Sequence, residues 1–168
     1  MSPDFLPGYS LQRGSSGDRP WLVKFAAQTY RELEPDRDFS DIDRTIEQYW
    51  SPETSVWFVE VADDRVPIKS SGLPRGIPHR ERVGCLWLGN ALDRISGERH
   101  THILLVYVVP EHRRRGIGTK LIRHAEAQAR ERGDRQIGLQ VFANNQPALE
   151  LYRNSGYQPL SFWMAKSL

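Results

Sequence analysis

The sequence predicts a mixed α/β fold with one central sheet, in the element order β-α-α-β-β-β-α-β-α-β. Short runs rich in β-branched and aromatic residues recur along the chain, and between them lie segments whose apolar residues repeat at helical spacing. The 168 residues are 39% apolar and 26% charged, which is the size and composition of one globular domain. We therefore expect residues 1–168 to form a single domain.

The first third of the chain predicts one strand followed by two helices. Residues 1–8 resemble a loose terminus, and 9–13 form a short strand candidate. From Asp18, with Pro20 just inside, a first amphipathic helix begins, because apolar positions recur every three or four residues; these positions are Leu22, Phe25, Ala26, Thr29 and Leu33. A second helix is predicted over 40–50.

Three strands are predicted in the middle of the chain. The stretch 55–62 is β-branched and aromatic, 82–90 is a second strand candidate, and 102–109 is the most strongly β-branched segment, stopped by Pro110. Residues 65–81 carry three prolines and two glycines, which predicts a long exposed loop. We interpret this loop as a flexible insertion; the alternative is that it covers an acidic acceptor or partner.

The last third predicts an alternation of helices and strands. A helix over 118–132 shows apolar side chains at helical spacing and is closed by Gly133 at the usual C-terminal cap position. A strand follows over 136–142, then a short helix over 147–154 and a final strand over 159–165.

The charge distribution and the cysteine content exclude several classes of protein. The net charge is only +2, with arginines concentrated at 113–115, and this indicates an anionic ligand more than a nucleic-acid surface. Cys85 is the only cysteine, so we expect no disulfide and no thiolate zinc site, and its apolar neighbours predict a buried thiol. The histidines show no ligand spacing, so we propose no metal. Without a leader or a membrane-spanning run, we expect a soluble cytoplasmic protein.

The segment 108–118 combines a strand end, three arginines and a glycine turn at the start of a helix. Backbone N–H groups at a helix N-terminus lack intrahelical acceptors and point the same way, so they can bind an anion. Gly116 and Gly118 would let a phosphate approach the backbone. A solvated basic turn is the alternative. A dinucleotide motif would need glycine where Leu121 stands, and a Walker loop would need a Gly-Lys-Ser/Thr ending.

Two motifs in this half of the chain resemble the GNAT superfamily of N-acetyltransferases. The run Arg-Arg-Arg-Gly-Ile-Gly over 113–118 is similar to its Arg/Gln-x-x-Gly-x-Gly/Ala pyrophosphate motif, preceded by Val-x-Pro-Glu. Residues 145–157 are similar to its pattern Asn-x-x-Ala-x-x-Leu-Tyr-x-x-x-Gly-Phe/Tyr. The specific resemblance covers about residues 102–160, and the order of the remaining elements is compatible with the same fold.

The resemblance implies acetyl-CoA as the co-substrate and a set of residues that hold it. The backbone of Val108 and Val109 would pair with the pantetheine arm, in a gap between the strand that ends near Val109 and the strand that begins near Gln136. The pyrophosphate would lie on Arg113, Arg114, Arg115, Gly116, Ile117, Gly118 and Thr119. Asn145 and Tyr152 would lie near the thioester.

Acyl transfer to an amine also needs a proton acceptor and a proton donor. Tyr152 resembles the family's general acid, since a phenol with a pKa near 10 is protonated at neutral pH; otherwise it is a packed helix tyrosine. His100 and His102 are two residues apart, so they share one side of a strand and are candidates for the base. Either could equally be a strand-edge histidine. Glu60 is a weaker candidate.

The predicted function is transfer of an acetyl group to a primary amine, on a small molecule or on a peptide or protein. The alternative is a catalytically silent module that binds acyl-CoA as a sensor or scaffold. Neither a nucleic acid nor a membrane is an expected partner. Dimers are common in the family, so a homodimer is a further expectation, although no segment of the sequence identifies an interface.

Overall fold

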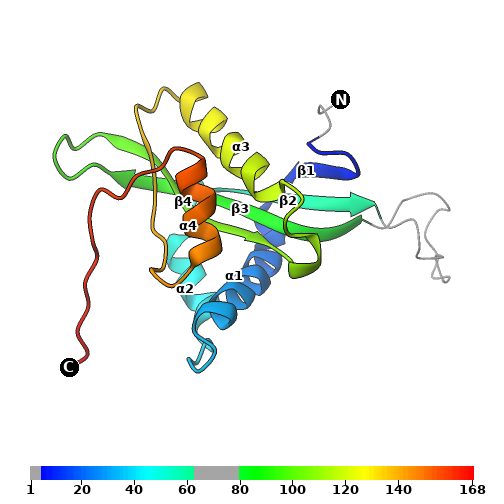
Figure 1. Cartoon of the computed structure of the whole chain (residues 1–168), viewed down its shortest axis with the longest axis horizontal. Coiled ribbons are helices and arrows are strands. Elements are labelled where there is room, and N and C mark those ends of the chain that lie inside the picture. Colours follow the sequence, from blue (N-terminus) through cyan, green and yellow to red (C-terminus); the bar gives the residue numbers. More distant parts are fainter. Residues whose placement is uncertain (1–4, 63–79) are drawn as a thin grey trace.

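A computed structural model describes residues 5–62 and 80–168 (Figure 1). Its strands are β1 (Tyr9–Arg13), β2 (Ser55–Ala62), β3 (Arg80–Leu92), β4 (Arg99–Val108) and β5 (Ile137–Leu139). Its α-helices are α1 (Arg19–Leu33), α2 (Ile42–Tyr49), α3 (Ile117–Glu131) and α4 (Gln146–Asn154). The predicted loop lies outside the described residues over 65–79, and its last two residues, Arg80 and Glu81, belong to β3.

The five strands form one mixed sheet in the order β1-β2-β3-β4-β5. Each neighbouring pair from β1 to β4 is antiparallel, and β4 and β5 are parallel. A parallel pair needs a crossover connection, and α3 supplies it between β4 and β5. In this βαβ unit, residues 109–116 connect the end of β4 to the start of α3.

The helices cover both faces of the sheet. The helices α1 and α2 pack on one face, around Leu22, Phe25 and Ile46, while α3 and α4 pack on the other, around Leu121 and Leu151 (Figure 1). The apolar spacing that predicts α1 and α3 is the spacing of the side chains that these helices bury.

A β-bulge in the β3–β4 pair changes which face β4 presents. The register shifts between Trp87, opposite Leu105, and Leu88, opposite Ile103, so Leu104 is the extra residue. Before the bulge Ile103 packs on the α3 face; after it, Leu105 packs on the α1 face. The bulge lies next to the point where β4 loses its pairing with β5.

One predicted element is wrong, and others differ in length. The final strand predicted over 159–165 is absent, because the segment pairs with no other strand and is exposed throughout. The strand predicted over 136–142 stops at Leu139. By contrast β3 and β4 are longer than predicted, because they extend each other as a hairpin up to the turn after Leu92. No helix among the described residues combines the length and the apolar character needed to cross a bilayer.

Phe58 tests the packing between the sheet and α1. Its side chain is fully buried, its ring lies 6.4 Å from that of Phe25, and the Arg82 guanidinium lies 4.3 Å above it. We expect Phe58→Ala to lower the free energy of unfolding by about 3–5 kcal/mol in urea titrations, from lost burial and the cavity left behind. Ile95→Ala, at a side chain 98% exposed, should change it by less than about 0.5 kcal/mol. Equal effects would contradict this packing.

Candidate active site

The turn between β4 and α3 has the backbone shape of an anion site. After Val108 the chain makes a short 3-10 turn, and Arg114 and Gly116 both adopt left-handed conformations, with φ of 59° and 83°. Gly116 is the N-cap of α3, and a Cβ added there would meet nothing within 4 Å. The first N–H groups of α3 have no acceptor within the helix, so a phosphate could accept their hydrogen bonds.

Two of the three arginines hold this turn in place. Arg113 donates from Nε to the carbonyl of Val108 at 2.8 Å and from one terminal nitrogen to both carboxylate oxygens of Glu32 at 2.8 Å. Arg115 donates to the Tyr9 hydroxyl at 3.1 Å and to the carbonyl of Glu111 at 3.0 Å. Across the described residues Arg114 makes no side-chain hydrogen bond or ion pair, so it is the arginine available to a ligand.

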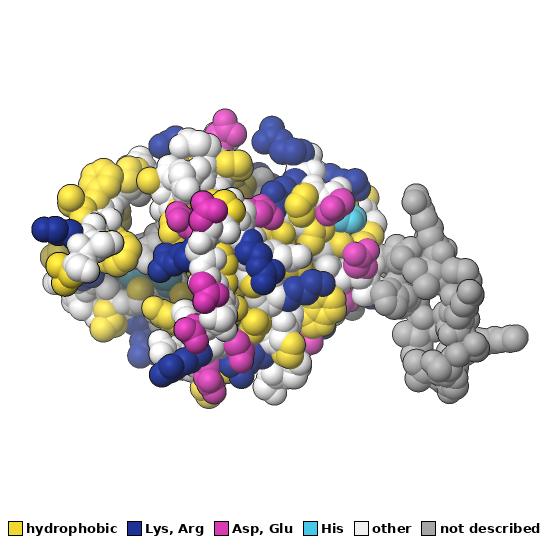
Figure 2. All heavy atoms as spheres, turned by 90° about the horizontal axis from the view of Figure 1, so that it is seen from below, with side chains coloured by type: hydrophobic (Ala, Val, Ile, Leu, Met, Phe, Trp, Pro, Cys, Tyr) yellow, Lys and Arg dark blue, Asp and Glu magenta, His cyan; other side chains and the backbone are white. Residues whose placement is uncertain are grey.

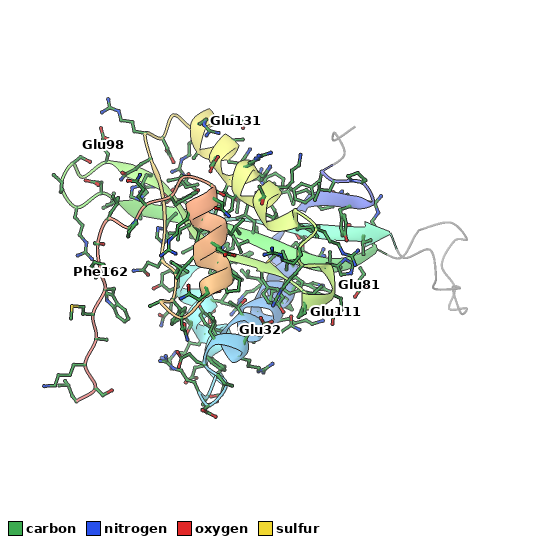
Figure 3. All side chains as sticks on the ribbon, viewed as in Figure 1. Glu32, Glu81, Glu98, Glu111, Glu131 and Phe162 are labelled. Atoms are coloured by element: carbon green, nitrogen blue, oxygen red, sulfur yellow. The ribbon has the colours of Figure 1, made fainter. Side chains whose placement is uncertain are left out.

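Glu32, which carries no motif in the sequence, links α1 to this turn (Figure 3). Its carboxylate also accepts a hydrogen bond from the Tyr107 hydroxyl at 3.0 Å, and the Arg113 guanidinium lies 5.5 Å from the Tyr107 ring. Burial and the Glu32 carboxylate raise the pKa of Tyr107 to about 12. A shallow pocket beside this group is lined by Gln28, Arg31, Glu32, Tyr107, Val109, Pro110 and Glu111.

The strands β4 and β5 part within the sheet. They pair only from Thr101, opposite Ile137, to Ile103, opposite Leu139, although β4 continues to Val108. Beyond Ile103, no strand of the described part of the chain lies beside β4 on the β5 side. This is the gap that an extended ligand would need.

The backbone of β4 presents a free donor to this gap. Val109 N–H is occupied, since it donates to the carbonyl of Val83 on β3 at 2.9 Å. Successive N–H groups of a strand point to opposite neighbours, so the N–H of Val108 points to the side that β5 has left. Of the two valines expected to bind the pantetheine arm, only Val108 directs its N–H there.

The two histidines lie where β4 and β5 still pair. Both are close to Gly138 of β5: a Cβ added at Gly138 would lie 3.1 Å from Nε2 of His100 and 3.6 Å from Nδ1 of His102. His100 is only 9% exposed, and its Nδ1 lies 3.2 Å from Nε2 of Gln136. His102 is partly exposed, and burial together with the neighbouring His100 lowers its pKa.

The helix α4 carries Tyr152 to the other face of the sheet. Tyr152 packs on the α3-side core, 5.8 Å between ring centroids from Tyr157, and burial raises its pKa to about 12. Its neighbour Leu151 lies so close to Gly118 that an added Cβ there would be 3.1 Å from it. Gly118 therefore allows α3 and α4 to approach.

Asn145 has a structural role in α4. It is the N-cap of the helix, and its side-chain oxygen accepts a hydrogen bond from the backbone N–H of Ala148 at 3.3 Å. Asparagine at this position satisfies one of the donors that a helix start leaves without an acceptor. The same oxygen is therefore engaged before any ligand binds.

The side chains of Glu60 and Cys85 have roles in the structure that leave them unavailable for catalysis. Glu60 accepts from Arg82 at 3.5 Å and lies 3.9 Å from Arg80, so ion pairs occupy its carboxylate. Cys85 is fully buried, which confirms the predicted core thiol, and burial raises its pKa.

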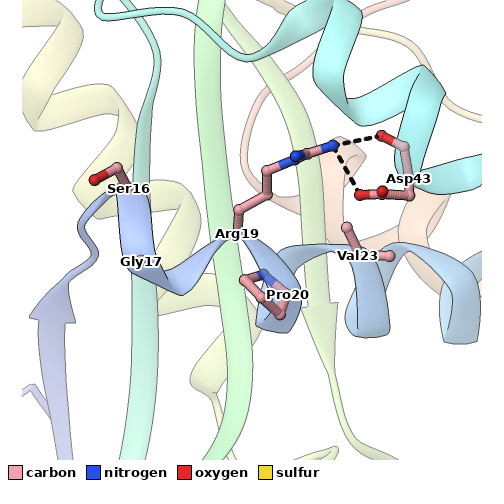
Figure 4. Close-up of a pocket in the computed structure, with 6 residues that line it drawn as sticks. All are labelled: Ser16, Gly17, Arg19, Pro20, Val23 and Asp43. Atoms are coloured by element: carbon pink, nitrogen blue, oxygen red, sulfur yellow. Dashed lines mark hydrogen bonds and ion pairs between the residues drawn. The ribbon is translucent and has the colours of Figure 1, made fainter.

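A separate pocket at the start of α1 contains none of the predicted site residues (Figure 4). Ser16, Gly17, Arg19, Pro20, Val23 and Asp43 line it, and within it Arg19 donates to the Asp43 carboxylate at 2.8 Å. This ion pair links α1 to α2. The pocket therefore lies apart from the turn and from the gap between β4 and β5.

A family profile matches the part of the chain that contains the turn, the gap and α4. The sequence profile of the acetyltransferase (GNAT) family matches residues 22–157, which includes the turn, the gap and α4. The chain belongs to this family. The GNAT resemblance of the two motifs and the predicted α/β fold are thereby confirmed.

Two sequence relatives of this GNAT chain are named as acetyltransferases. It is 38% identical over 74 residues to the uncharacterized N-acetyltransferase MJ1207 of Methanocaldococcus jannaschii, covering 44% of this chain and 31% of that protein. It is 46% identical over 52 residues to streptothricin acetyltransferase of Streptomyces lavendulae, covering 31% and 28%. The matches thus span less than a third of these relatives.

One similar crystal structure contains the cofactor that the motifs imply. It is a predicted acetyltransferase from Clostridium acetobutylicum with acetyl-CoA, with a TM-score of 0.68 and 16% identity, covering 95% of this chain and 96% of that one. At this identity the likeness shows that the two chains share the fold.

The capping role of Asn145 gives a direct test. We expect Asn145→Ala to lower the free energy of unfolding by about 1 kcal/mol, because the N–H of Ala148 loses its acceptor. Asn145→Asp, which keeps an acceptor at the start of α4, should retain most of that stability. Urea unfolding measures both. An alanine variant as stable as the parent would show that the cap contributes nothing.

Proposed function

We propose that this chain transfers an acetyl group from acetyl-CoA to the amine of an acceptor. One observation carries the proposal: β4 parts from β5 after Ile103, and the same strand ends in the anion-binding turn that begins α3. Acetyl-CoA has an extended thioester arm and a pyrophosphate. The arm needs a gap with free backbone groups, the pyrophosphate needs a group of N–H donors, and both must lie along one strand.

Acetyl-CoA would bind chiefly through backbone groups. The pyrophosphate lies over Gly116 and the first N–H groups of α3, with Arg114 as the adjacent cation. The pantetheine arm extends along the unpaired edge of β4, where Val108 N–H is directed. Arg113 and Arg115 support the site by keeping the turn in shape, through Glu32 and Tyr9.

In the reaction the acceptor nitrogen attacks the thioester carbonyl carbon. The N–C bond forms, negative charge develops on the carbonyl oxygen, and the C–S bond then breaks. A backbone N–H on the unpaired edge of β4, between the bulge and Val108, stabilises that oxygen, and preorganised donors of this kind contribute strongly to catalysis. The amine gives its proton to a base, and the departing thiolate takes a proton from Tyr152, whose raised pKa keeps it protonated across the physiological range.

His102 is the base we propose, in preference to His100. His100 is nearly inaccessible, and its Nδ1 lies against Gln136, whereas His102 is partly exposed. A pKa lowered by burial leaves the His102 imidazole neutral at physiological pH, ready to accept a proton. His102 lies before the bulge and Tyr152 packs on the opposite face, so the thioester in the gap would lie between base and acid.

The acceptor approaches from the face covered by α1 and α2, where the histidines and Glu32 lie. It is an amine on a small molecule or on a peptide or protein. Streptothricin belongs in the first set of amines to screen, since a streptothricin acetyltransferase is 46% identical to this chain over 52 residues.

The cofactor seat can be tested by thermal unfolding with acetyl-CoA. At about 100 times its Kd the ligand should stabilise the native state by about 2.7 kcal/mol, a rise in Tm of several degrees. Arg114→Glu should weaken binding by about tenfold or more, because it places a carboxylate beside the phosphates. Arg94→Glu makes the same charge change in the β3–β4 turn and should bind normally. If acetyl-CoA raises the Tm of Arg114→Glu as much as that of the parent, the pyrophosphate does not bind at this turn.

The pH dependence of CoA thiol release tests the chemistry. With saturating acceptor, kcat should fall as the pH drops through the His102 pKa, which lies below 6.5, because the protonated imidazole cannot act as a base. Ionisation of Tyr152 should not lower kcat until the pH approaches the Tyr152 pKa of about 12. His102→Gln should remove the acid limb, and Tyr152→Phe should lower kcat at all pH values.

Two results would contradict this scheme. An acid limb that survives in His102→Gln assigns the base elsewhere. Tight acetyl-CoA binding without thiol release above the water background, for every amine in the screen, would favour the alternative of a silent acyl-CoA-binding sensor or scaffold.

A further inference from the structure

The short connection between α3 and β5, residues 132–136, contacts the part of β4 that carries the two histidines. This part, residues 100–102, is here called the histidine segment. Successive side chains of a strand point to opposite faces, so His100 and His102 lie on one face and Thr101 on the other, the α3 face. Two side chains of the connection reach the segment, one toward each face.

Asp134 is the side chain that holds Thr101. Its carboxylate accepts hydrogen bonds from the backbone N–H and from the hydroxyl of Thr101, both at 2.6 Å. The Asp134 side chain is only 7% exposed, and Arg132 donates to it at 3.0 and 2.7 Å while also donating to Asn90 of β3. Burial raises the pKa of Asp134, but the hydrogen bonds from Arg132 and Thr101 outweigh it and lower the pKa. The carboxylate is therefore charged, and charged acceptors bind their donors more strongly.

Asp134 acts at the closed end of the gap between β4 and β5. The two strands pair over only three residues, from Thr101, opposite Ile137, to Ile103. A ladder this short gives each strand few hydrogen bonds, so the contacts at its ends matter for its position. The bulge at Leu104 lies at one end of the ladder, and Asp134 holds Thr101 at the other.

Gln136 is the side chain that holds His100 on the opposite face. Its Nε2 lies 3.2 Å from the Asp93 carboxylate and 3.2 Å from Nδ1 of His100. Backbone hydrogen bonds from Ser96 and Ile95 lower the pKa of Asp93 to about 2, so at physiological pH this carboxylate can only accept. The Gln136 amide therefore turns its NH₂ group toward Asp93, and the second N–H donates to Nδ1 of His100. The proton of the neutral His100 ring then lies on Nε2.

The tautomer of His100 decides which ring can take up a proton beside Gly138. A Cβ added at Gly138 would lie 3.1 Å from Nε2 of His100 and 3.6 Å from Nδ1 of His102, so both rings border this position. Nε2 of neutral His100 already carries a proton, which leaves His102 as the acceptor. His102 is paired with Gly89 on β3 and with Gly138 on β5, and neither glycine has a side chain to pack against its ring. The place of the ring therefore depends on the backbone of the histidine segment.

Long-range charge contributes little to this alignment. On the face seen in Figure 2, acidic and basic side chains are interspersed, and the net charge of the chain is only +2. The fields of mixed charges largely cancel at a distance, and salt screens what remains. The short-range contacts of the α3–β5 connection are therefore the ones that fix the histidine segment.

We propose that Asp134 and Gln136 are positioning residues for His102, the base of the acetyl transfer. Asp134 acts through Thr101. Gln136 acts through His100, which it also keeps in the tautomer that cannot accept a proton at Nε2. This inference rests on the proposed function. The 15 residues of α3 separate the connection from the acetyl-CoA turn by about 20 Å, so these side chains should affect proton transfer and leave cofactor binding unchanged.

Asp18 offers a matched control for Asp134. Its carboxylate accepts from the backbone N–H of Ser15 at 2.7 Å, from the Ser15 hydroxyl at 2.9 Å and from Arg82 at 2.7 Å. It makes the same kinds of hydrogen bond as Asp134, but at the start of α1. Alanine at either position removes an ion pair and two further hydrogen bonds, so a general loss of stability should affect both variants.

Steady-state kinetics with saturating acceptor separates positioning from stability. Asp134→Ala should lower kcat by about tenfold or more, because small displacements of a catalytic group are costly. Asp134→Asn keeps an acceptor for Thr101 and should recover most of the rate, while Asp18→Ala should have the parental kcat. In all three variants acetyl-CoA should raise the Tm as it does in the parent. Equal kcat values in Asp134→Ala and Asp18→Ala would overturn the role of Asp134.

Long-range ¹H–¹⁵N NMR of the imidazole rings tests the positioning in the free protein, without an acceptor. His100→Gln and His102→Gln assign the signals. In the parent, Nδ1 of His100 should be the unprotonated nitrogen, and Gln136→Leu, which removes the donor, should mix the two tautomers. The pKa of His102, held below 6.5 by burial and by His100, should rise toward 6.5 in Asp134→Ala as the ring loses burial, and not in Asp18→Ala.

The outcomes distinguish failure of this inference from failure of the proposed function. An unchanged His100 tautomer in Gln136→Leu would overturn the role of Gln136, and an unchanged His102 pKa in Asp134→Ala would overturn that of Asp134, whatever the acceptor is. If the NMR changes occur but His102→Gln retains the parental kcat, the contacts hold a histidine that is not the base, and the inference fails together with the proposed function.

Discussion

The separation of β4 from β5 after Ile103 is the constraint on which the rest of the structure depends. A parallel pair that continued to Val108 would satisfy the backbone of both strands and leave no gap. The bulge at Leu104 lies where the pairing ends, and it turns the following residues of β4 to the opposite face. The backbone groups of β4 that lose their β5 partners point toward the gap, and they are the groups that we propose bind the thioester arm.

The hydrogen bonds around the turn keep its three arginines apart. Three consecutive arginines would repel one another, and the structure separates them: Arg113 points to Glu32, Arg115 points to Tyr9, and Arg114 stays outside. The Glu32 carboxylate compensates the charge of Arg113 and fixes the end of α1 against the turn. The proposed anion site is therefore formed by backbone groups and supported by side chains, and glycine suits its centre because position 116 has a positive φ.

Local signals predicted the elements whose structure is decided locally. The turn at 113–118 is recognisable in the sequence because a helix start demands particular residues at particular places. The capping role of Asn145 at the start of α4 comes from the structure. Glu32 is not recognisable in the sequence, because its role comes from the contact of two distant elements, and nothing near it in the sequence marks it. The histidines were found by their spacing, but only the structure distinguishes the enclosed His100 from the accessible His102.

The remaining disagreement between pattern and structure has a different origin. The sequence predicts strand at 140–142 and again at 159–165, and the structure has neither. A strand is defined by its neighbour, so a segment of strand-like sequence stays irregular wherever no neighbour is available. Both segments retain exposed aromatic residues, Phe142 in one and Phe162 in the other. In each segment the residue pattern is that of a strand, and what the described residues lack is a strand beside it.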